Sequence, residues 1–276
     1  MPCDIGEDTM IGAVILSFND AKFAIKCVKS IQENSSGGED IVDEIDLIIV
    51  DNGCDEKNTK ILKSINIIPH KYIRLEKNMG VSIGYNTGIK QAFKDGCEYV
   101  VLFNADTEVK TKGWEQNMKK VFEKYKNTGM VGAMTNHINQ KKQNIKFYNN
   151  ELPNKVIKSK WVGLGLTMLS RKVVEDVGVL DENMGYGGAV DREYCLRLRL
   201  KGYQNYVDGN TFIFHHEGSN GFKNLGFKDF NLSYRKMRLN NHKYIKEKYK
   251  KYFIAKKKRK LELIEMRRNK NECKSI

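Results

Sequence analysis

The first hundred residues contain short apolar runs at regular intervals. Residues 11–16 (IGAVIL) and 45–50 (IDLIIV) have the length and the β-branched composition of buried strands. Similar runs predict a third strand near 72–75 and a fourth at 99–103. Each run ends in polar residues, which predicts that a loop follows each strand.

Segments with helical periodicity separate these strands. The first has apolar residues at helical spacing, namely Ala24, Cys27, Val28 and Ile31. Asn19 or Asp20 can cap it. Further helices are predicted at 57–65 and from Gly80 to about Lys94. Strands alternating with helices predict βαβ units, and therefore an α/β fold with a mostly parallel central sheet flanked by helices.

The second half of the chain is less regular. Residues 130–134 and 211–214 have the composition of strands, and 171–177 and 191–201 have that of helices. Residues 136–154 are polar and predict a mobile loop.

Polar residues follow the predicted strands. In open α/β sheets, ligands bind outside the carboxyl ends of the strands, so Asp51, Asn78 and Asp106 are expected to face one crevice. Mg²⁺ and Mn²⁺ take carboxylate and phosphate oxygens as ligands, and Asp106 directly follows an apolar strand. A simple strand-to-loop turn is the alternative interpretation of Asn104-Ala105-Asp106.

Four segments in sequence order add specificity: VILSFND, LIIVDNGCDE, LEKNMGVSIGYNTGIKQA and VLFNADTEV. Together they resemble the motifs of family 2 glycosyltransferases, which have the GT-A fold, and the resemblance covers roughly residues 10–220. It implies sugar transfer from a nucleotide-sugar whose diphosphate is held by Mn²⁺ or Mg²⁺.

The resemblance also implies roles for individual residues. Asp51 would bind the base or ribose. Asp106 would be the sole carboxylate of the metal motif that binds the ion, because Asn104 stands where many members carry an Asp. The implied donor-binding set is Ser17, Asn19, Asp51, Asn78, Gly80, Asn86 and Asn104. Tight helix packing is the alternative role for Gly80, Gly84 and Gly88.

The segment from Gly163 to Tyr203 resembles the acceptor half of the family. Asp191 matches its general base and Glu193 the following acid, although the Glu that commonly precedes this Asp is absent. A helix N-cap is the alternative role for Asp191. Trp161 could stack on an acceptor sugar or belong to the core.

His215 and His216 follow the last predicted strand, where many relatives place a histidine that completes the metal site. We expect one of the two to be a ligand, and the sequence does not distinguish them. The candidate metal ligands are therefore Asp106, His215 and His216.

The C-terminal segment carries nearly all of the net charge. Residues 235–276 contain 17 Lys or Arg and 4 Glu, which is +13 of the total +14. We predict a catalytic domain at 1–233 and a basic helical tail at 234–276. An anionic membrane surface is the favoured partner of the tail, nucleic acid is disfavoured, and a solvated extension is the alternative.

Other features predict a cytoplasmic protein, with peripheral membrane contact through the tail. No apolar run approaches the ~20 residues of a membrane helix. Residues 1–10 lack the basic start of a secretory signal. The six cysteines show no CxxC pair, as expected for reduced thiols.

The leading hypothesis is an inverting, metal-dependent hexosyl- or deoxyhexosyltransferase. Its donor would be a UDP- or dTDP-sugar, and its acceptor a hydroxyl of a glycan, a lipid-linked intermediate or a small molecule. A nucleotidyltransferase would need a Gly-rich basic loop after the first strand, and residues 17–23 (SFNDAKF) lack one. The other alternative is a catalytically inactive protein of the same fold that binds a nucleotide-sugar or a polyanion.

Overall fold

The computed structural model describes residues 10–37, 45–216, 230–259 and 262. The chain divides into two compact units, one up to Phe230 and one from Asn231 onward, and each is described by itself. Residues 217–219, which follow the histidine pair, and most of the tail beyond 259 lie outside the described residues.

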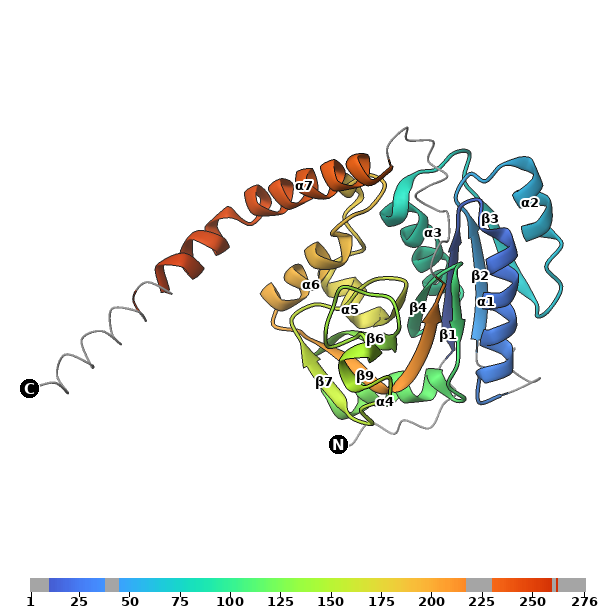
Figure 1. The fold of residues 1–276 in the computed structure, drawn as a ribbon, viewed down its shortest axis with the longest axis horizontal. Helices are drawn as coiled ribbons and strands as arrows, with labels where there is room; N and C mark the ends of the chain where they lie inside the picture. The colour runs from blue at the N-terminus through green and yellow to red at the C-terminus, as the bar shows by residue number, and fades with distance from the viewer. Residues whose placement is uncertain (1–9, 38–44, 217–229, 260–261, 263–276) are drawn as a thin grey trace, which may run out of the picture. The chain divides into compact units, whose positions relative to one another are not determined.

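The predicted strands and helices of the first hundred residues are confirmed (Figure 1). In chain order they are β1 (Ile11–Ser17), α1 (Ala21–Asn34), β2 (Ile45–Asp51), α2 (Glu56–Lys63), β3 (His70–Arg74), α3 (Gly80–Lys94) and β4 (Tyr99–Asn104). The capping of α1 differs from the prediction. Asp20 occupies the N-cap position without a side-chain cap bond, and the backbone N–H of Ala21 instead donates to Asn58 Oδ1 at 3.2 Å.

The second half contains more regular structure than the sequence predicts. Its elements are β5 (Thr107–Val109), α4 (Trp114–Lys124), β6 (Thr128–Thr135), a 3₁₀ helix (Ile145–Tyr148), β7 (Val156–Ser159), β8 (Leu166–Ser170), α5 (Arg171–Val177), a 3₁₀ helix (Glu182–Met184), α6 (Val190–Leu200) and β9 (Gln204–His215). Helices α5 and α6 match their predicted ranges. The sequence did not predict β5, α4 and β7, and β9 begins seven residues before the predicted strand.

One sheet holds all nine strands in the order β3-β2-β1-β4-β8-β6-β9-β5, with β7 also paired to β9. The pairs among β1 to β4 are parallel, as predicted. Beyond β4 the sheet is mixed, because β8 runs antiparallel to β4 and β6, and β9 is antiparallel to β5 and β7. The α/β fold with flanking helices is therefore confirmed, with a mixed rather than mostly parallel sheet.

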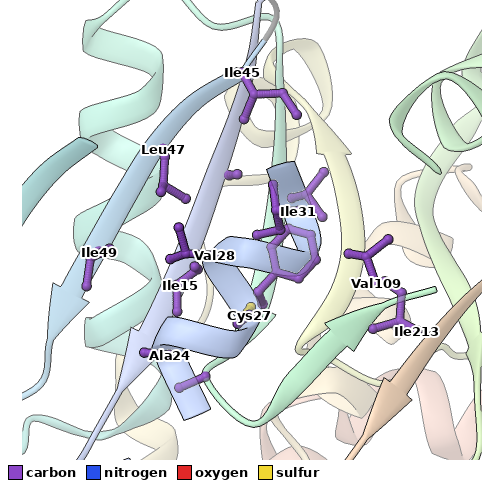
Figure 2. Close-up of a cluster of buried hydrophobic side chains, with 14 of the residues drawn as sticks. Ile15, Ala24, Cys27, Val28, Ile31, Ile45, Leu47, Ile49, Val109 and Ile213 are labelled. Carbon is purple, nitrogen blue, oxygen red and sulfur yellow. The ribbon is translucent and has the colours of Figure 1, made fainter. Parts of the chain in front are cut away.

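The central strand β1 is buried on both faces. Ile11, Ala13 and Ile15 belong to a hydrophobic cluster with the apolar side of α1, where Ala24, Cys27, Val28 and Ile31 point toward the strands (Figure 2). The alternate residues face α3, because a Cβ on Gly84 or Gly88 would lie within 2.4 Å of Leu16 or Val14. These two glycines thus permit close helix packing.

Residues 136–154 do not form the mobile loop that their polarity predicts. Gln140, Gln143 and Asn144 are buried, and the segment contains a 3₁₀ helix. The amides satisfy backbone groups: Gln143 Oε1 accepts from the N–H of Gly163 at 2.9 Å, and Gln140 Nε2 donates to the carbonyl of Trp161 at 2.7 Å. The polar residues are buried because they hold the 160–165 loop in place.

The second unit is helical where a basic helix is predicted. Helix α7 (Phe230–Lys248) is followed by helical residues 250–259. In the parts of the chain that the structure describes, no helix has an apolar stretch long enough to cross a bilayer.

Candidate functional site

Two predicted metal ligands lie together at the edge of the sheet. Asp106 follows β4, and His215 ends β9, which pairs with β5 so that His215 lies opposite Thr107. His215 Nε2 is 3.1 Å from Asp106 Oδ2, and both side chains are largely buried. Strand pairing therefore brings an imidazole and a carboxylate from distant parts of the chain into direct contact.

The second ring nitrogen of His215 defines its chemistry. Nδ1 lies 3.2 Å from the backbone carbonyl of His137, and because a carbonyl only accepts, Nδ1 must donate. In a neutral ring, Nε2 would then face Asp106 as one acceptor facing another. Burial opposes protonation of His215, but the hydrogen bond and charge of Asp106 outweigh it and raise the pKa of the ring.

This arrangement fits a divalent cation. A metal-binding histidine commonly donates its other ring N–H to a backbone carbonyl, as His215 does. A cation would also remove the conflict between the two facing acceptors. Among the described residues no cluster of three or more His, Cys, Asp or Glu side chains could hold a metal.

The neighbouring histidine belongs to a different cluster. His216 follows the last residue of β9, and its Nε2 lies 2.6 Å from Glu108 Oε1. The His216 ring also packs against Phe23 and Phe214. Burial would raise the pKa of Glu108, but Lys110 and His216 together lower it. The side-chain contacts therefore distinguish the two histidines: the His215 ring contacts the Asp106 carboxylate, and the His216 ring contacts that of Glu108.

Asp51, the predicted nucleoside ligand, is fully buried at the end of β2. Its carboxylate accepts four hydrogen bonds, and the donors are Cys54 N at 2.7 Å, Tyr72 Oη at 2.5 Å, Thr59 Oγ1 at 2.9 Å and Arg74 Nη1 at 2.7 Å. Burial would raise the pKa of Asp51, but the hydrogen bonds from Tyr72, Cys54 and Thr59 lower it below its usual value. The carboxylate therefore holds the Arg74 guanidinium, which is partly exposed, at the end of the strands.

This cluster predicts acid-dependent stability. The folded-state pKa of Asp51 is depressed, so its stabilising effect is complete above the unfolded value of about 3.9 and is lost as pH falls through the folded value. We expect Asp51→Asn to lower the free energy of unfolding by about 2–3 kcal/mol at pH 7. Urea unfolding at pH 7, 5 and 3 should show this difference unchanged down to about pH 5 and smaller at pH 3. A difference that persists undiminished at pH 3 would contradict the electrostatic origin.

Asn52, next to Asp51, organises the turn before α3. Its Oδ1 accepts from Met79 N at 3.0 Å, and its Nδ2 donates to Asn78 Oδ1 at 3.1 Å. Asn78 Oδ1 also accepts from the N–H of Gly80 at 2.8 Å. Gly80 has φ +86°, and a Cβ there would lie 2.3 Å from the carbonyl of Gly185. The first turn of α3 is thereby joined to the loop that leads into α6.

The other predicted donor-binding residues occupy different surroundings. Asn86 is buried, and its amide bonds the backbone of Leu180 and the side chain of Glu182. Asn104 Oδ1 accepts from Tyr85 Oη at 2.6 Å. Their amides therefore bridge elements of the fold.

Ser17 and Asn19 lie at the end of β1, near Asp51. Ser17 is opposite Asp51 in the parallel register, and its buried Oγ has no hydrogen-bond partner among the described residues. Asn19 has φ +58°, and its Oδ1 accepts from the N–H of Asp55 at 2.8 Å. This end of β1 thus offers one unused hydroxyl beside the Asp51 cluster.

The predicted base lies in the first turn of α6. Ala189 holds the N-cap position with φ +74°, so Asp191 is not the cap residue. Asp191 is partly buried, whereas Glu193 is completely buried and bonded to Arg197 at 3.0 Å. The structure therefore gives the two acids different surroundings, and Glu193 has no exposed surface for a substrate.

Comparison with known proteins identifies the family. Residues 13–173, more than half of the chain, match the model "Glycosyl transferase family 2". The chain belongs to glycosyl transferase family 2. No curated protein sequence matches it significantly.

Solved glycosyltransferase structures share the fold at low sequence identity. GalNAc-T7, solved with UDP, GalNAc and Mn²⁺, is similar with a TM-score of 0.61 and 13% identity, over 78% of this chain and 45% of that one. The mannosyltransferase PcManGT of Pyrobaculum calidifontis, solved with GDP-Man and Mn²⁺, gives 0.60 and 16%, over 80% and 60%. S. aureus TarS residues 1–349 gives 0.56 and 13%, over 75% and 60%. The chain thus spans about half the length of these structures.

In this family 2 glycosyltransferase, several residues of the site were not predicted from the sequence. Tyr72 and Arg74 lie two residues apart on β3 and both donate to Asp51 Oδ2, and Arg74 lies opposite Asp51 in register. Asn136 anchors the backbone of His215 on both sides, with bonds of 2.7 and 3.0 Å, and His137 follows it. The rule that strand ends carry ligands would have found Asn136 and His137 after β6. The contact between Asp51 and Arg74 could be predicted only from the register of β2 and β3.

Proposed function

We propose that this chain catalyses metal-dependent transfer of a sugar from a nucleotide-sugar to an acceptor hydroxyl, with inversion at the anomeric carbon. The observation that carries the proposal is the Asp106–His215 pair, a buried carboxylate and imidazole in contact at the carboxyl edge of the sheet. Both relatives solved with a nucleotide or nucleotide-sugar also contain Mn²⁺. We propose a UDP- or dTDP-hexose or deoxyhexose as the donor.

The donor would lie along the ends of β1, β2 and β4. Arg74 offers guanidinium donors to acceptor atoms of the base or ribose, and Asp51 holds it in place. Asp106 and His215 would bind Mn²⁺ or Mg²⁺, and the nitrogen ligand favours Mn²⁺. When bound, the ion supplies charge stabilisation for the departing diphosphate.

Asp191 is the proposed general base. Its carboxylate lies in the first turn of α6 and can accept the proton of an attacking hydroxyl. Attack from the side opposite the diphosphate inverts the anomeric carbon. Glycans, lipid-linked intermediates and small molecules all present suitable hydroxyls.

Donor hydrolysis tests the proposal directly. The full chain is incubated with a panel of UDP-, dTDP- and GDP-sugars, with Mn²⁺, with Mg²⁺ or with EDTA, and nucleotide release is measured. Metal-dependent release from one donor would support the transferase. A chain that binds a nucleotide-sugar by calorimetry but neither hydrolyses nor transfers it would support the inactive alternative. Absence of both binding and turnover would refute the proposal.

We also propose that the basic tail binds an anionic membrane surface, which would make the enzyme a peripheral one. Between 231 and 259 the chain has twelve Lys or Arg and one Glu, with tyrosines under lysine ammonium groups, as for Lys248 over Tyr244 and Lys256 over Tyr252. Exposed Leu239 and Ile254 add apolar surface. Lysine-rich helices with aromatic residues suit the lipid headgroup region.

Vesicle sedimentation tests the tail. We expect binding to vesicles with about 30% phosphatidylserine, little binding to neutral vesicles, and release by salt. Replacing Lys256, Lys257 and Lys258 by Gln should weaken binding about 100-fold, because each basic residue contributes about 1 kcal/mol. The matched control replaces the exposed Lys57, Lys60 and Lys63 of α2. Equal effects of the two triple variants would contradict a specific role for the tail, and tighter binding to duplex DNA would favour nucleic acid.

A further inference from the structure

Arg192 and Trp161 form an unusual pair beside the proposed base. The guanidinium carbon of Arg192 lies 4.8 Å from the centre of the Trp161 ring, and both side chains are partly buried. Arg192 directly follows Asp191 in the first turn of α6, whereas Trp161 lies in the loop between β7 and β8. The two residues thus join the helix of the base to a loop that the buried amides of 140–143 hold in place.

Among the described residues, Arg192 differs from the other arginines of the first unit in its partners. Of the five arginines in the first unit, Arg74, Arg171 and Arg197 form salt bridges, and Arg199 donates to the carbonyl of Cys195. Within the described residues, the Arg192 side chain contacts the Trp161 ring. It forms no salt bridge with a carboxylate and no hydrogen bond to a carbonyl there. A partly buried cation without a counter-ion is unfavourable, so a bound anion would stabilise this arrangement.

Stacking leaves the guanidinium ready to bind such an anion. A cation–π contact uses the face of the group, while its N–H donors point outward in the plane. That planar fork matches the two oxygens of a carboxylate or phosphate, and the ring fixes its orientation in advance. The pair therefore has the properties of an oxyanion-binding site.

The loop that carries Trp161 reaches the donor side. Gly165 O accepts from the N–H of Asn104 at 3.2 Å, and Asn104 ends the strand that precedes Asp106. Trp161 and Gly165 are four positions apart in the sequence, which limits the distance between their Cα atoms to roughly 14 Å. A short oligosaccharide can span this distance.

We propose that Arg192, held by Trp161, binds an oxyanion of the acceptor and thereby orients the attacking hydroxyl toward Asp191. The acceptor would be an anionic glycan, with either a uronic acid carboxylate or a phosphate near the accepting sugar. The inference rests on the proposed function, because it assigns Arg192 to the acceptor side of the same site. The donor diphosphate is the competing anion, and it would bind on the Asp106 side.

Calorimetry and kinetics with matched acceptors test the inference. The full chain with UDP and Mn²⁺ is titrated with an oligosaccharide ending in glucuronic acid, its glucose-ended counterpart and its 6-phosphorylated counterpart. We expect at least one anionic form to bind about tenfold or more tighter than the neutral form. Arg192→Gln should abolish that preference, Arg192→Lys should keep only part of it, and Trp161→Ala should weaken it more than Trp161→Phe. Which anionic form is preferred distinguishes carboxylate from phosphate.

The control is Lys201→Gln, which removes a basic side chain at the other end of α6 and should leave acceptor binding unchanged. Equal binding of neutral and anionic acceptors, or an Arg192→Gln variant with the wild-type preference, would overturn the inference. A selective loss of UDP affinity in Arg192→Gln would also overturn it and assign the residue to the diphosphate. If one of these results is obtained while the wild-type chain binds UDP and hydrolyses the donor in a metal-dependent way, only the inference about Arg192 fails. If both are absent, the proposed function itself fails.

Discussion

Replacing Asp106 by Asn is expected to lower the rate of sugar transfer by roughly 10²–10³-fold, because several kcal/mol of transition-state stabilisation depend on the metal. The amide keeps the size of the side chain and a hydrogen bond to His215, but it loses the negative charge that would hold the cation. His215→Ala should also lower the rate, since it removes the second proposed metal ligand. The remaining activity of Asp106→Asn should respond weakly to Mn²⁺, and a metal titration of nucleotide release measures this.

The protein supplies a matched control two residues away. Glu108 and His216 form a second carboxylate–imidazole pair, with a 2.6 Å contact. Glu108→Gln and His216→Ala remove a pair of similar chemistry, and we expect both variants to retain metal dependence and most of their activity. If His216→Ala lost metal dependence and His215→Ala kept it, the assignment of the ligands would be reversed.

The contrast between these two histidines illustrates what sequence reasoning can and cannot determine. The sequence does not distinguish two adjacent histidines at a strand end, and only the three-dimensional contacts pair His215 with Asp106 and His216 with Glu108. The parallel half of the sheet was predictable because β1, β2 and β4 are nearly continuous apolar runs. The short β5 and β7 carry no such signal, so these two strands of the antiparallel half were not predicted.

The buried amides show a second limit. Gln140, Gln143 and Asn144 look like a solvated loop in the sequence, yet they are buried because they bond backbone groups of a distant segment. In the same way, Asn86 matches a family motif that implies the nucleotide pocket, and its amide bonds Leu180 and Glu182 in the structure. Long-range hydrogen bonding of this kind leaves no periodic pattern in the sequence.

Asp191 and Glu193 give the other large expected effect. Although the two acids lie in one helical turn, replacing Asp191 should lower the rate of transfer, whereas replacing Glu193 should lower the stability of the fold. We expect Asp191→Asn to reduce the rate of transfer by about 10²–10⁴-fold, the usual contribution of a general base, with unchanged UDP affinity and thermal stability. The side chain is partly exposed in the first helical turn, and the N-cap is Ala189, so its loss should cost the fold little.

Glu193→Gln should instead weaken the fold. Its carboxylate is fully buried against Arg197, which also donates to the carbonyls of Val177 and Val179, and breaking a buried ion pair costs on the order of 3 kcal/mol. The folded fraction of this variant should retain near-normal kcat and nucleotide affinity, with a lower melting temperature. Urea unfolding, UDP calorimetry and transfer rates measured on both variants decide the question. If Glu193→Gln lost turnover at wild-type stability while Asp191→Asn kept it, the base would be Glu193, and α6 would have to move for a substrate to reach it.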